Sequence, residues 1–121
     1  PIQLALSYPE RMPEPAVPLL DLAAAGTLHF GRPDTERFPC LRLAMDAGAA
    51  GGTVPAAMAA ADEIAVERFL RREIGFLDIP RVIERVLEQH RPVADPSLDE
   101  VLAADAEARR LAAAVPAGVP A

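Results

Sequence analysis

The stretch from Ala57 to Leu70 constrains the fold more than any other, because it carries the longest uninterrupted helical pattern in the chain. At about 100° per residue, one helix face carries the apolar residues Met58, Ala61, Ala65, Val66 and Phe69. Asp62 lies within that apolar face, where a carboxylate without a partner is costly. The stretch predicts an amphipathic helix whose buried acid needs either a partner or a function.

The composition indicates a mainly α fold. Hydrophobic residues make up 51% of the chain but aromatic residues only 4%, so the core must be built from aliphatic side chains and many Ala. Ala has the highest helix propensity. The prolines gather at 9–18 and near the starts of apolar runs, where helices tolerate them. We predict a small helical bundle of about four helices, preceded by a proline-rich linker.

Three further stretches predict the other helices of this bundle. A helix beginning at Pro39 places Leu41, Ala44, Met45 and Gly48 on one face. A helix capped by Asp78 repeats apolar residues at helical spacing, namely Ile79, Val82, Ile83, Val86 and Leu87. The last helix begins with the capping box of Ser97 and Glu100 and is expected to bury Leu98, Val101, Leu102 and Ala112. Thr53 is the expected N-cap of the helix that contains Asp62.

The chain is expected to divide into four parts. Residues 1–12 are predicted to end an upstream domain, 13–35 to form the linker, 36–114 to form the C-terminal helical bundle, and 115–121 to be a disordered tail. The first residue is Pro1 and not Met, which favours a cut inside a larger protein.

Residues 27–30 of the linker alternate polar and apolar side chains, which is typical of a half-buried strand. No second strand is predicted, so this orphan strand needs a sheet from elsewhere. Two explanations remain open. The strand pairs either with an upstream region or with a partner chain.

Charge and composition exclude several classes of protein. The formal net charge of −6 argues against binding to nucleic acid, which requires a basic face. No apolar run reaches the roughly 18 residues that span a bilayer, and no signal peptide or lipidation motif occurs. The single Cys40 fits a reducing compartment. A cytoplasmic protein is expected.

Few residues in the chain are candidates for chemistry, because no glycine-rich dinucleotide motif, P-loop or metal-binding spacing occurs. His29 on a half-buried strand is interpreted as a solvated residue, and His90 at a helix end as a structural one. Cys40 is interpreted as a small packed hydrophobe and not as an activated thiol. The sequence assigns no catalytic, cofactor-binding or metal-binding residue.

Asp62 and Asp105 each fall within an apolar helix face. One hypothesis is a shared carboxylate site for a cation, which would require further oxygen ligands. The favoured hypothesis is a pair of buried acceptors held by helix-end amides or by an arginine, either Arg42, Arg68 or Arg109. In the second case, removing either carboxylate lowers stability by about 1 to 3 kcal/mol, because donors are left unpaired.

Several separated motifs, in the same order along the chain, resemble the C-terminal third of the 1-deoxy-D-xylulose 5-phosphate reductoisomerase family. These motifs are residues 1–11, 26–30, 36–44, 60–66, 76–80 and 98–106. One departure occurs at the central helix, where members usually carry Asn-Ala-Ala-Asn-Glu and this chain has Ala59 to Glu63 with Asp62 in place of the second amide. An Asp still accepts the same hydrogen bonds, but the two amides are lost.

The resemblance implies a function for the whole enzyme. Members convert 1-deoxy-D-xylulose 5-phosphate to 2-C-methyl-D-erythritol 4-phosphate in non-mevalonate isoprenoid biosynthesis, using NADPH and a divalent cation, Mg²⁺ or Mn²⁺. The resemblance places the catalytic and metal-binding residues upstream of Pro1, so this chain would be structural and inactive alone. Its implied partners are the upstream domains, in an enzyme expected to be a homodimer. The alternative is a stand-alone helical interaction module that pairs through the edge of its strand.

Overall fold

The computed structural model describes residues 2–10 and 20–118. The chain divides into two units, Pro1–Arg32 and Pro33–Ala121. Within the described residues all regular secondary structure is helical, which confirms the predicted mainly α class. None of the described helices combines the length and the hydrophobicity that crossing a membrane requires.

The described residues of the first unit include two short helices, α1 (Ile2–Ser7) and α2 (Leu22–Ala25). Asp21 caps α2, because its carboxylate accepts hydrogen bonds from the backbone N–H groups of Ala23 at 2.9 Å and Ala24 at 3.1 Å. The helix ends at Gly26, whose φ of 70° suits glycine. Much of the predicted proline-rich linker falls on residues 11–19, outside the described residues.

The predicted strand over residues 27–30 is not formed. These residues have no regular secondary structure, and all four side chains are exposed, with Leu28 at 55% and Phe30 at 91%. A strand needs neighbouring backbone groups with which to pair, and no strand occurs in the part of the chain that the structure describes. The described residues therefore offer no strand with which residues 27–30 could pair.

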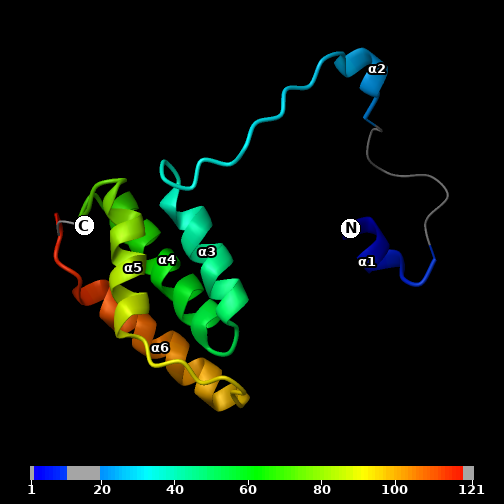
Figure 1. The fold of residues 1–121 in the computed structure, drawn as a ribbon. Coiled ribbons are helices and arrows are strands. Elements are labelled where there is room, and N and C mark those ends of the chain that lie inside the picture. The colour runs from blue at the N-terminus through cyan, green and yellow to red at the C-terminus, as the bar shows by residue number, and fades with distance from the viewer. Residues whose placement is uncertain (1, 11–19, 119–121) are drawn as a thin grey trace. The chain divides into compact units, whose positions relative to one another are not determined.

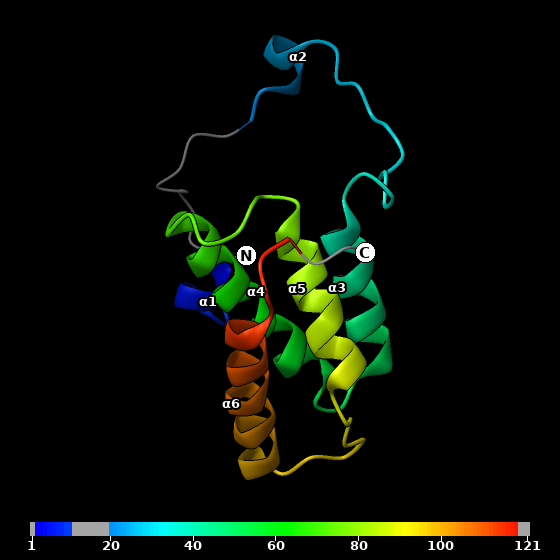
Figure 2. The same cartoon turned by 90° about the vertical axis from the view of Figure 1, so that its left-hand side faces the viewer.

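The second unit is a bundle of the helices α3 (Pro39–Ala50), α4 (Val54–Leu70), α5 (Asp78–Gln89) and α6 (Leu98–Ala114). Helix α4 contacts each of the other three, and α5 also contacts α3 and α6. Figure 2 shows α6 and α3 on opposite sides of the bundle with α4 and α5 between them. The helix predicted from Ala57 to Leu70 is therefore the centre of the bundle, and it begins three residues earlier.

Helix α4 can contact three neighbours because its buried side chains are small. Ala57, Ala60, Ala61 and Ala65 are each at most 1% exposed. The larger core side chains come mainly from α5, where Val82, Ile83 and Val86 are fully buried. Small residues on one helix thus accommodate branched residues on its neighbour, as close packing requires. The buried surface of α4 is centred on these alanines, and Val66 of the predicted face is 37% exposed.

The two helices with the clearest sequence signals form as predicted. In α5, Ile79, Val82, Ile83 and Val86 are buried, and Leu87 packs against the core. At the start of α6, Ser97 Oγ accepts the Glu100 N–H at 3.3 Å and the Glu100 carboxylate accepts the Ser97 N–H at 2.8 Å. The predicted capping box is confirmed.

The buried faces of α3 and α6 differ from those predicted. In α3 the buried residues are Leu43 and Ala47, whereas Leu41 and Met45 of the predicted face are 41% and 63% exposed. In α6 the buried residues are Ala108 and Ala112, whereas Leu98 and Leu102 are 73% and 58% exposed. The predicted face of α3 was therefore wrong. In α6 the burial of Ala112 is confirmed, but Leu98 and Leu102 were predicted wrongly, because α6 packs on α4 through its small residues.

Two residues predicted as N-caps make other contacts. The side chain of Thr53 accepts no hydrogen bond from the first turn of α4, and Leu77, not Asp78, occupies the N-cap position of α5. Asp78 instead accepts the Gly75 N–H at 2.8 Å and pairs with Arg81 at 3.0 Å. Its carboxylate therefore orders the turn that leads into α5.

Candidate functional site

A mainly apolar pocket of about 270 Å³ lies where the start of α3, the middle of α4 and the start of α5 meet. The first residues of α3 and α5 lie at the same end of the bundle (Figure 1). The pocket is lined by Arg37, Phe38, Pro39, Cys40, Asp62, Val66, Phe76, Leu77, Ile79 and Pro80. Several of these side chains remain exposed, with Phe38 at 58%, Phe76 at 67% and Leu77 at 70%.

Local contacts hold the aromatic residues of the pocket in place. The ring of Phe76 packs edge to face on Phe69, with 5.7 Å between the ring centroids and 68° between the ring planes. The guanidinium of Arg37 lies 5.7 Å from the centroid of the Phe38 ring. The exposed faces of these aromatic residues are therefore held at the pocket by neighbouring side chains.

Asp62 is the only acidic residue in the pocket lining, and its carboxylate has no hydrogen bond or ion pair within residues 2–10 and 20–118. Its charge acts on its neighbour Cys40. Burial is the main cause that raises the pKa of the Cys40 thiol, and the negative charge of Asp62 raises it further. Cys40 is thus a protonated, poorly nucleophilic thiol, in agreement with its interpretation as a packed residue.

The three arginines considered as partners for Asp62 are engaged elsewhere. Arg42 pairs with Asp46 at 3.5 Å and Glu84 at 3.4 Å. Arg68 donates to the backbone carbonyl of Ala112 at 2.7 Å and lies 3.4 Å from the Glu73 carboxylate. The hypothesis that Asp62 is a satisfied acceptor therefore has no support in the described part of the chain, and the stability loss predicted from it loses its basis.

For Asp105 the predicted arginine partner is confirmed, although its side chain is 36% exposed and not buried. Its carboxylate accepts two hydrogen bonds from Arg109, at 2.7 Å and 3.3 Å, and Arg109 also binds Glu63 of α4 at 2.5 Å. The hydrogen bonds to Asp105 and then to Glu63 raise the pKa of Arg109. Arg109 therefore links α6 to α4, and Asp105 orients it.

The structure does not bring Asp62 and Asp105 together as one cation site. The partners of Asp105 are Arg109 and, through it, Glu63, whereas Asp62 faces the residues of the pocket. Among the described residues, no group of three or more His, Cys, Asp and Glu side chains is placed to hold a metal ion. His29 is exposed in the first unit.

A second pocket, of about 480 Å³, lies between α6 and the segment around the end of α5, with Thr53 of the α3–α4 turn also lining it. Thr53 is buried there, and its hydroxyl accepts the Val93 N–H at 3.1 Å and lies 2.9 Å from His90 Nε2. His90 is therefore part of a structural hydrogen-bond network. Its interpretation as a structural residue agrees with this contact.

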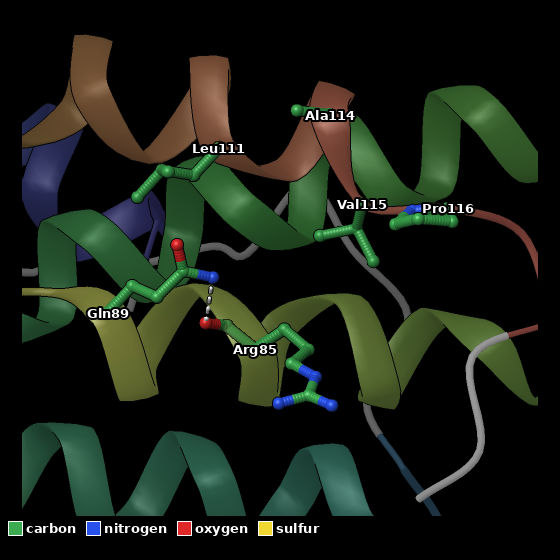
Figure 3. Close-up of a pocket in the computed structure, with 6 residues that line it drawn as sticks. All are labelled: Arg85, Gln89, Leu111, Ala114, Val115 and Pro116. Atoms are coloured by element: carbon green, nitrogen blue, oxygen red, sulfur yellow. Dashed lines mark hydrogen bonds between the residues drawn. The ribbon is translucent and has the colours of Figure 1, made fainter.

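A third pocket, of about 380 Å³, lies between α5 and the end of α6 (Figure 3). Gln89 and Arg85 line it from α5, but the Gln89 amide donates to the Arg85 backbone carbonyl at 3.1 Å. The Arg85 guanidinium pairs with Glu88 at 3.2 Å. The polar groups of this pocket thus bind neighbours on their own helix. Val115, the first residue of the predicted tail, lines the pocket and is buried.

Sequence reasoning missed the apolar residues that surround Asp62. Phe38 immediately precedes the first residue of α3, and Phe76 and Leu77 immediately precede that of α5. Large apolar residues in two turns, outside both helical stripes, were the signal available in the sequence. Only the tertiary structure brings the two turns to the same pocket.

The chain matches the family model of the DXP reductoisomerase C-terminal domain over residues 1–111. It is 56% identical over 119 residues to the 1-deoxy-D-xylulose 5-phosphate reductoisomerase of Moorella thermoacetica, covering 98% of this chain and 31% of that enzyme. It is 54% identical over 110 residues to the enzyme of the same name from Shouchella clausii, covering 91% and 29%. The chain thus spans about a third of the length of these relatives.

Solved structures agree with these matches. The 1-deoxy-D-xylulose 5-phosphate reductoisomerase from Zymomonas mobilis in complex with NADPH superposes with a TM-score of 0.82 at 46% identity, over 93% of this chain and 30% of that one. A DOX-P reductoisomerase in complex with magnesium superposes with a TM-score of 0.79 at 35% identity, with the same coverage of both chains.

Proposed function

Because the chain belongs to the family of DXP reductoisomerase C-terminal domains, we propose that it is the C-terminal helical domain of a 1-deoxy-D-xylulose 5-phosphate reductoisomerase. The complete enzyme would convert 1-deoxy-D-xylulose 5-phosphate to 2-C-methyl-D-erythritol 4-phosphate, using NADPH and Mg²⁺ or Mn²⁺. The observation that carries the proposal is the 56% identity to the Moorella thermoacetica enzyme over 98% of this chain.

Within that enzyme, the chain would have a structural role. Its described residues do not fit either the cofactor or the metal, because they contain no cluster of metal-binding side chains and the sequence contains no glycine-rich dinucleotide motif. Two polar side chains that line the other pockets are already bound, since His90 contacts Thr53 and Gln89 binds its own helix. We therefore assign the catalytic, NADPH and metal sites to the residues that precede this chain in its relatives.

The division into parts follows from the same proposal. Residues 1–12 would end the catalytic domain, and 13–35 would connect it to the bundle of 36–114. Residues 115–121 would follow the bundle as a tail whose first residue, Val115, packs in the core. Residues 27–30 would become a strand by pairing with a sheet of the catalytic domain. The exposure of Leu28 and Phe30, at 55% and 91%, supports this pairing, because the described residues leave more than half of each side chain uncovered. The homodimer and the cytoplasmic location stay predictions.

A hybrid enzyme tests the proposal. The C-terminal 31% of the Moorella thermoacetica enzyme that matches this chain is replaced by residues 1–121, and oxidation of NADPH is followed with 1-deoxy-D-xylulose 5-phosphate and Mg²⁺. We expect the hybrid to be active, and the Moorella enzyme truncated at the same junction to be inactive. An inactive but folded hybrid would contradict the proposal and favour a stand-alone interaction module.

A further inference from the structure

One end of the bundle exposes a continuous apolar surface. Phe38, Val66, Phe76 and Leu77 surround the pocket that contains Asp62, and are between 37% and 70% exposed. We refer to these four residues as the Phe76 patch. They come from three places in the sequence, and the fold of the bundle brings them together. A grouped apolar surface around a pocket is typical of a site at which another polypeptide binds.

A partner that binds this apolar surface must also supply a hydrogen-bond donor to Asp62. Asp62 lies within the pocket and has no hydrogen bond or ion pair with any described residue. A carboxylate in mainly apolar surroundings is stabilised by a hydrogen-bond donor, and the pocket lining places none on it. The surface therefore fits an occupant that presents an apolar side chain to the patch and a donor to Asp62.

The covalent continuity of the chain favours one occupant. The relatives are about three times as long as this chain, and the matched family is a C-terminal domain, so their additional residues precede the matched region. In the complete enzyme, the residues upstream of Pro1 would be linked to Phe38 of the patch through residues 1–37 of the same polypeptide. This covalent link gives the upstream residues a higher effective concentration at the patch than a separate chain would have.

A second copy of this chain fits the surface less well. A two-fold interface brings the same patch of both copies together and would therefore bring two Asp62 carboxylates into one apolar contact. Both copies also carry a formal net charge of −6, so their overall charge opposes association.

We propose that the Phe76 patch and Asp62 are the docking surface for the preceding part of the same polypeptide, which supplies an apolar side chain to the pocket and a hydrogen-bond donor to Asp62. This inference rests on the proposed function, because it requires the upstream domains of the enzyme. Asp62 would then accept a hydrogen bond from another domain, although its helix α4 lies at the centre of the bundle.

Photo-crosslinking in the hybrid enzyme tests the docking surface. A benzophenone-bearing amino acid replaces Leu77 in one variant and Leu98 in the control, since these residues are similarly exposed at 70% and 73% but Leu98 lies at the start of α6. After illumination, mass spectrometry locates the crosslink, and denaturing gels separate crosslinks within one chain from crosslinks between two chains.

We expect position 77 to crosslink within one chain to residues upstream of Pro1, and position 98 not to do so. A crosslink from position 77 to a second copy would overturn the proposal, as would the absence of a crosslink to the upstream residues. The activity of the unsubstituted hybrid reports separately on the proposed function. An active hybrid without the crosslink would leave that function standing and reject the docking surface.

A second measurement concerns Asp62 alone. Asp62→Ala should lower the thermal midpoint of the hybrid by about 2 °C or more, because the donor that faces it loses its acceptor. Asp95→Ala serves as the control, since Asp95 is an exposed acidic residue in the loop before α6. Equal midpoints for the two variants would contradict the assignment of a donor to Asp62.

Discussion

The two ends of the helical bundle differ in the contacts that their turns make. At one end, the α3–α4 turn is bound to the segment after α5, because the Thr53 N–H donates to the Val93 carbonyl at 3.0 Å and the Val93 N–H donates to the Thr53 hydroxyl at 3.1 Å. At the other end, the turns before α3 and α5 leave Phe38, Phe76 and Leu77 more than half exposed. Hydrogen bonds within the chain close the first end, although Leu98 and Leu102 at the start of α6 are exposed. The second end leaves exposed apolar side chains around a pocket, and we refer to it as the open end.

The end that contains Thr53 therefore needs no partner from outside the bundle. Paired hydrogen bonds at the closed end satisfy buried backbone groups without any outside partner. The open end has its aromatic residues fixed by neighbours, through Phe69 and Arg37, but not covered by them. We therefore expect substitutions at the closed end to affect the stability of the chain alone, and substitutions at the open end to act mainly when the upstream domains are present.

The largest effect at the closed end is expected from Gly52→Ala. Gly52 has a φ of 56°, and a Cβ at this residue would lie 2.1 Å from the Val93 carbonyl oxygen. The substitution should lower the free energy of unfolding by about 2 kcal/mol or more, because left-handed strain and displacement of the loop add together. Urea denaturation of the chain measures this change.

Two other glycines provide matched controls for Gly52. Gly51 has a φ of 69° but open space around the Cβ position, so Gly51→Ala should cost only about 1 kcal/mol of strain. Gly48 lies in α3 with open space around it, and Gly48→Ala should stabilise the chain by about 0.5 to 1 kcal/mol. Equal losses for Gly51 and Gly52 would show that contact with Val93 does not matter.

The next effect is expected from Thr53→Val, which keeps the shape of the side chain and removes its hydroxyl. Thr53 is 1% exposed, so the Val93 N–H and His90 Nε2 would each lose a buried partner. We expect a loss of about 1 to 3 kcal/mol in the free energy of unfolding. Thr53→Ser keeps the hydroxyl and should retain the hydrogen bonds. A Ser variant less stable than the Val variant would indicate that packing, and not hydrogen bonding, holds this end.

Thr53 also illustrates a contact that could not be predicted from the sequence. A Thr before a helical pattern is a standard N-cap, and its position at the start of α4 was predictable. Its hydroxyl instead binds Val93, which is 40 residues away in the sequence. The residues next to Thr53 therefore predict where α4 begins. The hydrogen-bond partner of the Thr53 side chain depends instead on the tertiary contact between the segment after α5 and the α3–α4 turn.

The same limit applies to the buried faces of the helices. The stripe of α5 was predictable because its branched residues contrast sharply with its charged ones. In α6, apolar residues occur on more than one side. The burial of Ala112 was predictable, but the sequence does not say whether Leu98 and Leu102 or Ala108 is buried with it. Burial of the alanines follows from close helix packing, a property of the pair of helices and not of either sequence.

A smaller effect is expected at the open end, from Leu77→Gln. In the chain alone, this substitution should change the free energy of unfolding by less than about 0.5 kcal/mol, because Leu77 is 70% exposed. In the hybrid enzyme, it should lower the thermal midpoint by about 2 °C, since a polar side chain would enter the docking contact. Leu98→Gln, at a similarly exposed leucine, should be neutral in both proteins. Equal behaviour of the two variants in the hybrid would remove the distinction between the two ends.

The smallest effect concerns the charge in the open pocket. Asp62 raises the pKa of the Cys40 thiol, although less than burial does. Asp62→Asn should therefore lower this pKa and increase the thiolate fraction at a given pH. We expect iodoacetamide to react with Cys40 faster in this variant, by less than the about tenfold change that one pKa unit gives. Asp46→Asn is the control, because Asp46 lies on the same helix as Cys40 but is not a cause of the shift.

The same pair of groups sets a pH dependence of stability. Because the folded thiol has a raised pKa, its contribution to stability is complete below the pKa of the unfolded thiol and is lost as the pH rises through the folded value. The free energy of unfolding should then fall less at alkaline pH in Asp62→Asn than in the parent chain. If docking of the upstream domains places a donor on Asp62, that donor offsets its charge, and the substitution should affect Cys40 less in the hybrid than in the chain alone. An equal effect in both proteins would argue that the pocket stays open in the complete enzyme.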